Sequence, residues 1–170
     1  MADEEGGTGT HEALPNGADT TPQIGLISQY VKDLSFENPN APAVYQWQEQ
    51  PQIDVQFNIG ATPVADDVHE VVLKIDIKAQ GANGVAFLAE LAYAGLFGMR
   101  NVPVEQVQPF LLAEAPRLVF PFARRVLADA IRDGGFPPLL LEPIDFGALY
   151  MQQAEAAQAQ QGDGETVGHA

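Results

Sequence analysis

The sequence contains no cysteine and only three histidines among its 170 residues. The absence of cysteine excludes disulfide bonds, thiolate metal sites and thiol catalysis, and it fits a reducing compartment. No apolar run approaches the ~18 residues that a membrane-spanning helix needs. Basic residues are also scarce, because 8 Lys and Arg stand against 23 Asp and Glu, for a net charge of −15. Such a chain should repel nucleic acid and anionic lipid and attract basic partners. The alternative is that the acidity only confers solubility.

Patterns that carry catalytic chemistry are absent as well. His11 and His169 lie in the predicted tails, His69 lies on a predicted strand, and no spacing of His, Asp and Glu resembles a metal site. Asp66 and Asp67 could form a carboxylate pair, but they lie in a turn, where Asp is favoured for local hydrogen bonding. The sequence contains neither a phosphate-binding glycine loop nor a nucleophile elbow. It therefore predicts a protein that is not an enzyme and has no cofactor.

The composition predicts one globular domain between two tails. Hydrophobic residues make up 46% of the chain, which is sufficient for a core. Residues 1–22 have almost nothing to bury and are expected to form a disordered acidic tail, and residues 156–170 a flexible one. The N-terminus has neither the basic nor the apolar part of a signal peptide, so we expect a soluble protein of the cytoplasm.

The domain is organised around a predicted hairpin over residues 68–99. Apolar residues at 71, 73, 75 and 77 alternate with charged residues at 70, 74, 76 and 78, the turn is Asn83-Gly84, and 85–99 forms the returning strand. Residues 23–37 and 52–60 also alternate. The short links predict an antiparallel meander with one apolar and one polar face. Residues 38–51 contain several prolines and should form a crossing loop, with Trp47 as its anchor.

Helical periodicity replaces alternation after residue 98. The expected segments are a helix over 103–115 interrupted near Pro109, a longer helix over 117–133, an extended stretch over 136–143, and a last helix capped by Asp145. The long helix should bury two adjacent apolar stripes, Val119/Phe122/Val126/Ala130 and Ala123/Leu127/Ile131. Its charged residues Arg124, Arg125 and Asp129 should face away. The sequence thus predicts an α+β fold in which helices pack on one face of a four-stranded sheet.

Two surfaces of this fold could bind other proteins. Leu88 and Glu90 share the even face of the last strand, and Asp33 and Glu37 lie on the polar face of the first. If these strands share a sheet, the four residues form an acidic patch with an apolar centre, which suits a basic protein partner. The alternative is an ordinary solvated sheet face.

The second surface is apolar. Trp47, the leucines at 139–141 and the row Ile53/Val55/Phe57 could together line an exposed groove that binds extended polypeptide with low selectivity. The alternative is that the core absorbs them all.

Four stretches resemble the SecB protein-export chaperone family, and they occur in the same order as in that family. They are SFENPNAP at 35–42, ADDVHEVVL at 65–73, LVFPFAR at 118–124, and FPPL followed by FGAL between 136 and 149. The similarity covers about residues 23–155, which we take as the chaperone domain.

The resemblance implies a homotetramer, a dimer of dimers in which helices lie between two outer sheets. It implies an ATP-independent holdase that keeps precursor proteins unfolded and hands them to the SecA motor ATPase, without inserting into the membrane itself. Assembly of four chains would bring the net charge to roughly −60, from 4 × −15, a field that speeds capture of basic segments. The alternatives are a SecB-like chaperone for a non-export client such as an antitoxin, and a small-ligand α+β enzyme.

The resemblance also implies roles for individual residues. It assigns contact with SecA to Asp33, Glu37, Leu88 and Glu90. It assigns support of tetramer assembly to Ala89, Leu91 and Tyr93. It places Ile53, Val55, Phe57 and Tyr150 in the client groove.

Overall fold

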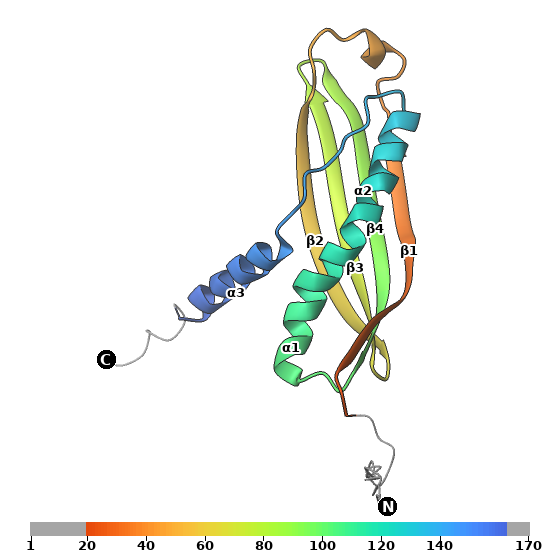
Figure 1. Cartoon of the computed structure of the whole chain (residues 1–170). Helices are drawn as coiled ribbons and strands as arrows, with labels where there is room; N and C mark the ends of the chain where they lie inside the picture. Colours follow the sequence, from red (N-terminus) through yellow and green to blue (C-terminus); the bar gives the residue numbers. More distant parts are fainter. Residues whose placement is uncertain (1–19, 163–170) are drawn as a thin grey trace, which may run out of the picture.

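The computed structural model describes residues 20–162 as four long strands followed by helices (Figure 1). The strands are β1 (Gln23–Glu37), β2 (Gln52–Ala65), β3 (Val68–Gly81) and β4 (Gly84–Arg100). They form one antiparallel sheet in the order β1-β4-β3-β2. The predicted hairpin is confirmed as β3 and β4, which are the two central strands. Helix α2 (Ala115–Asp133) lies against one face of this sheet, as the α+β prediction expected, whereas the last helix, α3 (Phe146–Gly162), projects away from the sheet (Figure 1).

The strand order shows that the predicted four-strand meander is wrong. Strands β2, β3 and β4 follow one another through tight turns, but β1 pairs with β4 instead of β2. Residues 38–51, which include the 3-10 turn η1 (Ala43–Gln46), carry the chain across the end of the sheet to its far edge (Figure 1). Buried Val44 anchors this loop, and Trp47 is half-buried near it. The result is a Greek key that leaves β1 and β2 as free edges.

The helical half begins with α1 (Val104–Pro109), continues through a wide π-helical turn, η2 (Phe110–Glu114), and becomes α2 (Ala115–Asp133). The predicted interruption near Pro109 is thus confirmed as η2. Pro109 and Pro116 lack the amide hydrogen that an α-helix needs, so each removes one bond from the regular hydrogen-bond ladder near η2. Gly134 caps α2 and Gly135 follows with φ of +86°, a conformation that favours glycine.

The core lies between α2 and the inner face of the sheet. Alternate residues of β3 and β4 fill it, and four fully buried residues of α2 cover them: Val119, Ala123, Leu127 and Ile131. At Gly95 a Cβ atom would lie 2.8 Å from Phe97 Cε2 and 3.2 Å from Val119 Cγ1, so a glycine lets the helix and sheet approach closely.

Two details of α2 differ from the prediction. Phe122 remains 40% exposed, because the buried stripe follows Val119 and Ala123 instead. Arg124 does not face away into solvent. Its Nη1 donates to the carbonyl oxygen of Leu141 at 3.3 Å, and its guanidinium lies 5.6 Å from the centre of the Phe120 ring. Arg124 therefore holds the extended segment over residues 136–145 against the helix.

The motif at 35–42 ties three elements together. The Asn38 side-chain amide donates to the carbonyl oxygen of Gly134 at 3.2 Å and to the Tyr45 hydroxyl at 2.7 Å. Tyr45 donates to the same Gly134 carbonyl at 2.8 Å, and Asn40 donates to the carbonyl of Val85 at 2.8 Å. These bonds satisfy a free carbonyl at the end of α2 and fix the loop to β4. The motif therefore has a structural role.

The last helix, α3 (Phe146–Gly162), follows the extended segment. Asp145 caps it, as predicted, because its Oδ1 accepts from the Ala148 amide at 2.9 Å. The helix continues past residue 155, where the prediction placed the start of a flexible tail. Residues 1–19 and 163–170, on which the rest of the tail predictions fall, lie outside the described residues.

Candidate functional site

The outer face of the sheet, opposite the helices, brings together the four residues predicted for the acidic patch. Residues that oppose each other on adjacent antiparallel strands share a face. Ser35 lies opposite Glu90, and Glu37 lies opposite Leu88. Asp33 lies opposite Ala92, one step further along the same face. Asp33, Glu37 and Glu90 are exposed and Leu88 is half-buried, so an apolar side chain lies among three carboxylates.

The pairing of β3 with β4 adds a fifth residue that the sequence reasoning missed. Asp76 lies directly opposite Glu90, although like charges in this position repel each other. Its Oδ1 atom is buried and has no hydrogen-bond partner. A hollow of about 190 Å³ is lined by Asp76, Leu88 and Glu90 together with neighbouring residues of β2 and β3. The only signal for Asp76 in the sequence was its even position in β3, which predicts that it shares the polar face of that strand with Lys74 and Lys78.

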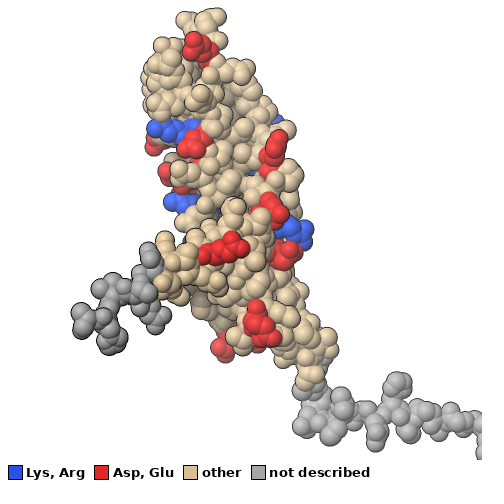
Figure 2. All heavy atoms as spheres, turned by 90° about the vertical axis from the view of Figure 1, so that its left-hand side faces the viewer, with Lys and Arg blue, Asp and Glu red and all other residues tan. Residues whose placement is uncertain are grey.

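The charges of the outer face are mixed but acidic on balance. On this face the cross-strand register places six carboxylates and three cations, and Lys32 reaches the same face from β1 to pair with Glu70. The carboxylates are Asp33, Glu37, Asp54, Glu70, Asp76 and Glu90, and the three cations are Lys74, Lys78 and Arg100. Figure 2, which views the molecule from the β2 side, also shows Asp and Glu side chains scattered widely, with fewer Lys and Arg among them. A face of this kind attracts a basic surface more than an acidic one.

One polar cluster on the outer face joins β1 to β3. Glu70 accepts from the Lys32 ammonium at 2.6 Å through Oε1 and from the Tyr30 hydroxyl through Oε2. The hydrogen bond from Lys32, and then that from Tyr30, holds the pKa of Glu70 below its ordinary value. The hydrogen bond to Glu70 raises the pKa of Tyr30. Glu70 therefore keeps its negative charge and Tyr30 keeps its proton near neutral pH.

The predicted client groove is present in part. Ile53, Val55 and Phe57 lie on the helix side of β2, because they oppose Ala79, Ile77 and Ile75 of β3. Ile53 is 40% exposed, whereas Val55 and Phe57 are half-buried against the core. Tyr150 is half-buried on α3. The structure thus leaves Ile53 the most accessible of the three β2 residues.

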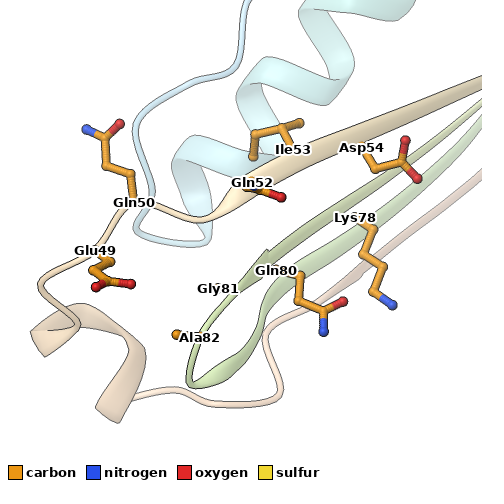
Figure 3. A pocket seen from close by; sticks show the side chains of 9 residues that line it. All are labelled: Glu49, Gln50, Gln52, Ile53, Asp54, Lys78, Gln80, Gly81 and Ala82. Carbon is orange, nitrogen blue, oxygen red and sulfur yellow. The ribbon is translucent and has the colours of Figure 1, made fainter.

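An apolar hollow of about 300 Å³ opens beside Ile53. Its other apolar walls come from the loop before β2, from β4 and from the extended segment: Pro51, Phe87, Phe136, Pro137, Pro138 and Leu139. Leu139 belonged to the predicted groove, but Phe87 and Phe136 did not. The hollow shares Ile53 and Gln50 with a larger polar one of about 750 Å³, where the start of β2 meets the end of β3 (Figure 3). In Figure 3 the side chain of Ile53 points to the helix side, while Lys78 and Gln80 point to the other.

The three residues predicted to support assembly are buried inside the protomer. Ala89 and Leu91 are fully buried and Tyr93 is 6% exposed, because the inner face of β4 lies in the core. They are not free to contact a second subunit directly. Any effect on assembly would have to pass through the helices that cover them.

The structure exposes another apolar surface, which the sequence reasoning did not single out. The free edge strand β1 carries large hydrophobic residues that are each more than 40% exposed: Ile24, Leu26, Ile27, Val31 and Leu34. Leu118 and Phe122 of α2 are exposed to a similar degree. A long apolar edge strand is a site for strand pairing with another chain. The clue in the sequence was the density of apolar residues in 24–34.

The described residues offer little for metal or membrane chemistry. Within residues 20–162 no group of three or more His, Asp and Glu side chains could hold a metal ion. None of the helices in this range is long and apolar enough to cross a membrane. The site is instead a pair of surfaces, a polar sheet face and an apolar hollow, which define a protein-binding module.

Comparisons with known proteins identify this module. Residues 17–157 match the family model described as preprotein translocase subunit SecB. The chain is 67% identical to the protein-export protein SecB of Sphingopyxis alaskensis, over all of both chains. It is 68% identical to that of Rhizorhabdus wittichii, over 89% of this chain and 92% of the relative. The chain belongs to the SecB family of protein-export chaperones, which are not enzymes.

A solved structure supports the fold. A SecB-like chaperone of Mycobacterium tuberculosis, solved in complex with an antitoxin peptide, superimposes with a TM-score of 0.60. The match covers 71% of this chain and 90% of the other at 16% sequence identity. The four-stranded sheet followed by helices is therefore the SecB-like fold, as predicted.

Proposed function

We propose that this protein is an ATP-independent holdase of the cytoplasm that keeps precursor proteins unfolded and delivers them to the SecA motor ATPase. The full-length identity of 67% to a protein-export protein SecB carries the proposal. The same relative favours export over the alternative of an antitoxin client. A holdase acts by mass action, because it binds the unfolded chain and lowers the concentration of chain that is free to fold.

The apolar hollow beside Ile53 is the proposed client site. Its walls are mostly aliphatic, aromatic and proline side chains, with Gln50 at the rim. An apolar client side chain would gain affinity from burial with little selectivity. A folded protein would be excluded, since its apolar segments are already hidden. Val55, Phe57 and Tyr150 would extend the groove along β2 and α3 if the helices moved slightly apart.

The outer face of the sheet is the proposed contact for SecA. Asp33, Glu37 and Glu90 would supply charge and Leu88 an apolar centre, and Asp76 would add a carboxylate whose Oδ1 has no hydrogen-bond partner in the protomer. The client hollow opens on the helix side of the sheet, so the two partners would occupy separate surfaces. Alternation along the strands keeps these surfaces apart.

The proposed assembly is a homotetramer built as a dimer of dimers. The free edge of β1 and its exposed apolar side chains would pair with the same strand of a second copy, which is the isologous arrangement of a two-fold dimer. The exposed residues Leu118 and Phe122 of α2 would be covered in the same assembly. Four hollows on one particle would raise the avidity for a long client.

The client site is tested by Ile53→Asp, which places a charge at the mouth of the hollow. We expect the affinity for a chemically unfolded precursor to fall by roughly five- to tenfold, since part of an isoleucine burial is lost and a carboxylate must be desolvated. Fluorescence titration with a labelled precursor measures it. The matched control is Gln52→Asp, which adds the same charge on the outer face of the same strand. Equal client affinities for Ile53→Asp, Gln52→Asp and wild type would contradict the assignment.

A further inference from the structure

Strand β1 does not alternate regularly, and one irregularity lies at the acidic patch. The register of β1 on β4 passes from Val31 opposite Tyr93 to Asp33 opposite Ala92, so that Lys32 has no partner. Two residues of β1 thus oppose one of β4, which is the pattern of a β-bulge. A second shift, between Leu26 and Ser28, lies further toward the N-terminus.

The bulge at Lys32 decides which face the acidic residues occupy. Before it, the odd-numbered Val31 lies on the core side, opposite the buried Tyr93. After it, the even-numbered Phe36 lies on the core side and packs on Phe87, with ring centres 5.8 Å apart. If β1 continued without the extra residue, every later side chain would change face. Asp33 and Glu37 would then point toward the helices and away from Glu90.

The cluster around Glu70 fixes this bulge from both sides. Tyr30 and Lys32 flank Val31, and each bonds a different oxygen of the same carboxylate. Tyr30 lies opposite Ala94 of β4, and Glu70 lies on β3 opposite Leu96 of β4. The side chains of Tyr30 and Lys32 therefore both reach over β4 to meet Glu70. The Glu70 side chain is only 14% exposed, and a charged hydrogen bond with limited solvent access is stronger than an open surface pair.

We propose that the Tyr30–Glu70–Lys32 cluster is a positioning device that holds the β1 bulge and thereby presents Asp33 and Glu37 on the SecA-binding face. None of the three residues needs to touch the partner. The inference rests on the proposed function of the outer face, and it adds residues that act on docking through the backbone of β1. In this proposal Lys32 strengthens the binding of SecA by holding the bulge, although its positive charge alone would weaken the binding of a basic partner.

The substitution Lys32→Gln separates the two effects. If Lys32 acted only through its charge, removing it from an acidic face would tighten the binding of a basic partner. If it holds the bulge, the affinity for SecA should fall by about threefold or more, the effect expected from losing a partly exposed ion pair. Tyr30→Phe, which changes no charge, should weaken binding in the same direction. Lys32→Arg keeps the ion pair and should retain wild-type affinity.

Lys74→Gln is the matched control. Lys74 lies on the same face, and no ion pair between residues 20 and 162 includes it. Its loss should leave the affinity unchanged or raise it. Surface plasmon resonance with immobilised SecA measures the affinity of wild type and of the four variants at one salt concentration. Equal or tighter binding by Lys32→Gln, with wild type binding normally, would overturn the positioning role. Failure of wild type itself to bind SecA would instead overturn the proposed function of the face.

Hydrogen exchange supplies a readout that a loss of global stability would not reproduce. In Lys32→Gln and Tyr30→Phe, amide exchange should accelerate in the peptide covering residues 28–37 and stay at the wild-type rate in β2 and α2. Acceleration spread evenly over the whole sheet, or none in β1, would contradict a local device. The holding of an unfolded precursor should remain normal in both variants, because the client hollow lies on the other face.

Discussion

The Glu90→Lys protein is expected to lose most of its affinity for SecA while it continues to hold unfolded precursors. Glu90 is exposed near the middle of the outer face, with Ser35 on one side and Asp76 on the other. Reversing its charge removes one carboxylate and places an ammonium beside Asp76, which would then pair with the lysine and no longer with the partner. The new ammonium would also repel the basic surface of the partner. We expect the affinity to fall by roughly tenfold or more.

The measurement is a titration of SecA at about 0.15 M ionic strength, where surface charges separated by more than ~8 Å are largely screened. Glu105→Lys, an equal charge reversal at an exposed position in the first turn of α1, is the control. It should bind SecA as wild type does. If Glu90→Lys also bound normally, the outer face would not be the docking surface, whatever the total charge of the particle.

The second large effect is expected on assembly. Replacing Ile27 and Val31 together by Asp should convert the proposed tetramer into particles of half its mass or less. Their side chains are 60% and 43% exposed on the free edge strand, so the fold of the protomer should tolerate the change. In a two-fold interface each new carboxylate meets the same strand of the other copy, and the repulsion is therefore applied twice. The lost burial of two aliphatic side chains adds to it.

Light scattering coupled to gel filtration measures the mass. Val64→Asp introduces the same chemistry at a 52% exposed valine near the end of β2, the opposite edge strand, and should leave the mass at the wild-type value. A tetramer that survived the double substitution in β1 would show that subunits meet elsewhere. In that case the exposed residues Leu118 and Phe122 of α2 become the leading candidates for the contact between subunits.

Much of this fold could be predicted from local patterns. Alternation over residues 52–60 and 68–80, with Asn83-Gly84 between long strands, predicted strands β2 and β3 and the β3–β4 hairpin without any tertiary information. Proline and glycine marked the ends of the helical half, and Asp145 marked the start of α3. The resemblance to SecB then gave the fold class, which the superposition bears out.

What could not be predicted depends on non-local packing. The crossing of residues 38–51 to the far edge is a property of the whole sheet, so short links suggested a meander instead. The bulge at Lys32 leaves no mark in the sequence, yet the face of Asp33 and Glu37 depends on it. Leu91 and Tyr93 alternate correctly on β4, but only the position of α2 shows that they are buried in the protomer. Asp76 needed the register of β3 on β4 before its place beside Glu90 was visible.

The central claim is that this chain holds unfolded precursors without using ATP. The most direct measurement is the refolding rate of a slow-folding precursor, diluted from denaturant into buffer that contains the protein and no nucleotide. We predict that the delay in refolding grows with the concentration of the protein, and that an already folded precursor is unaffected. Refolding at the rate seen without the protein, at concentrations well above that of the precursor, would contradict the claim.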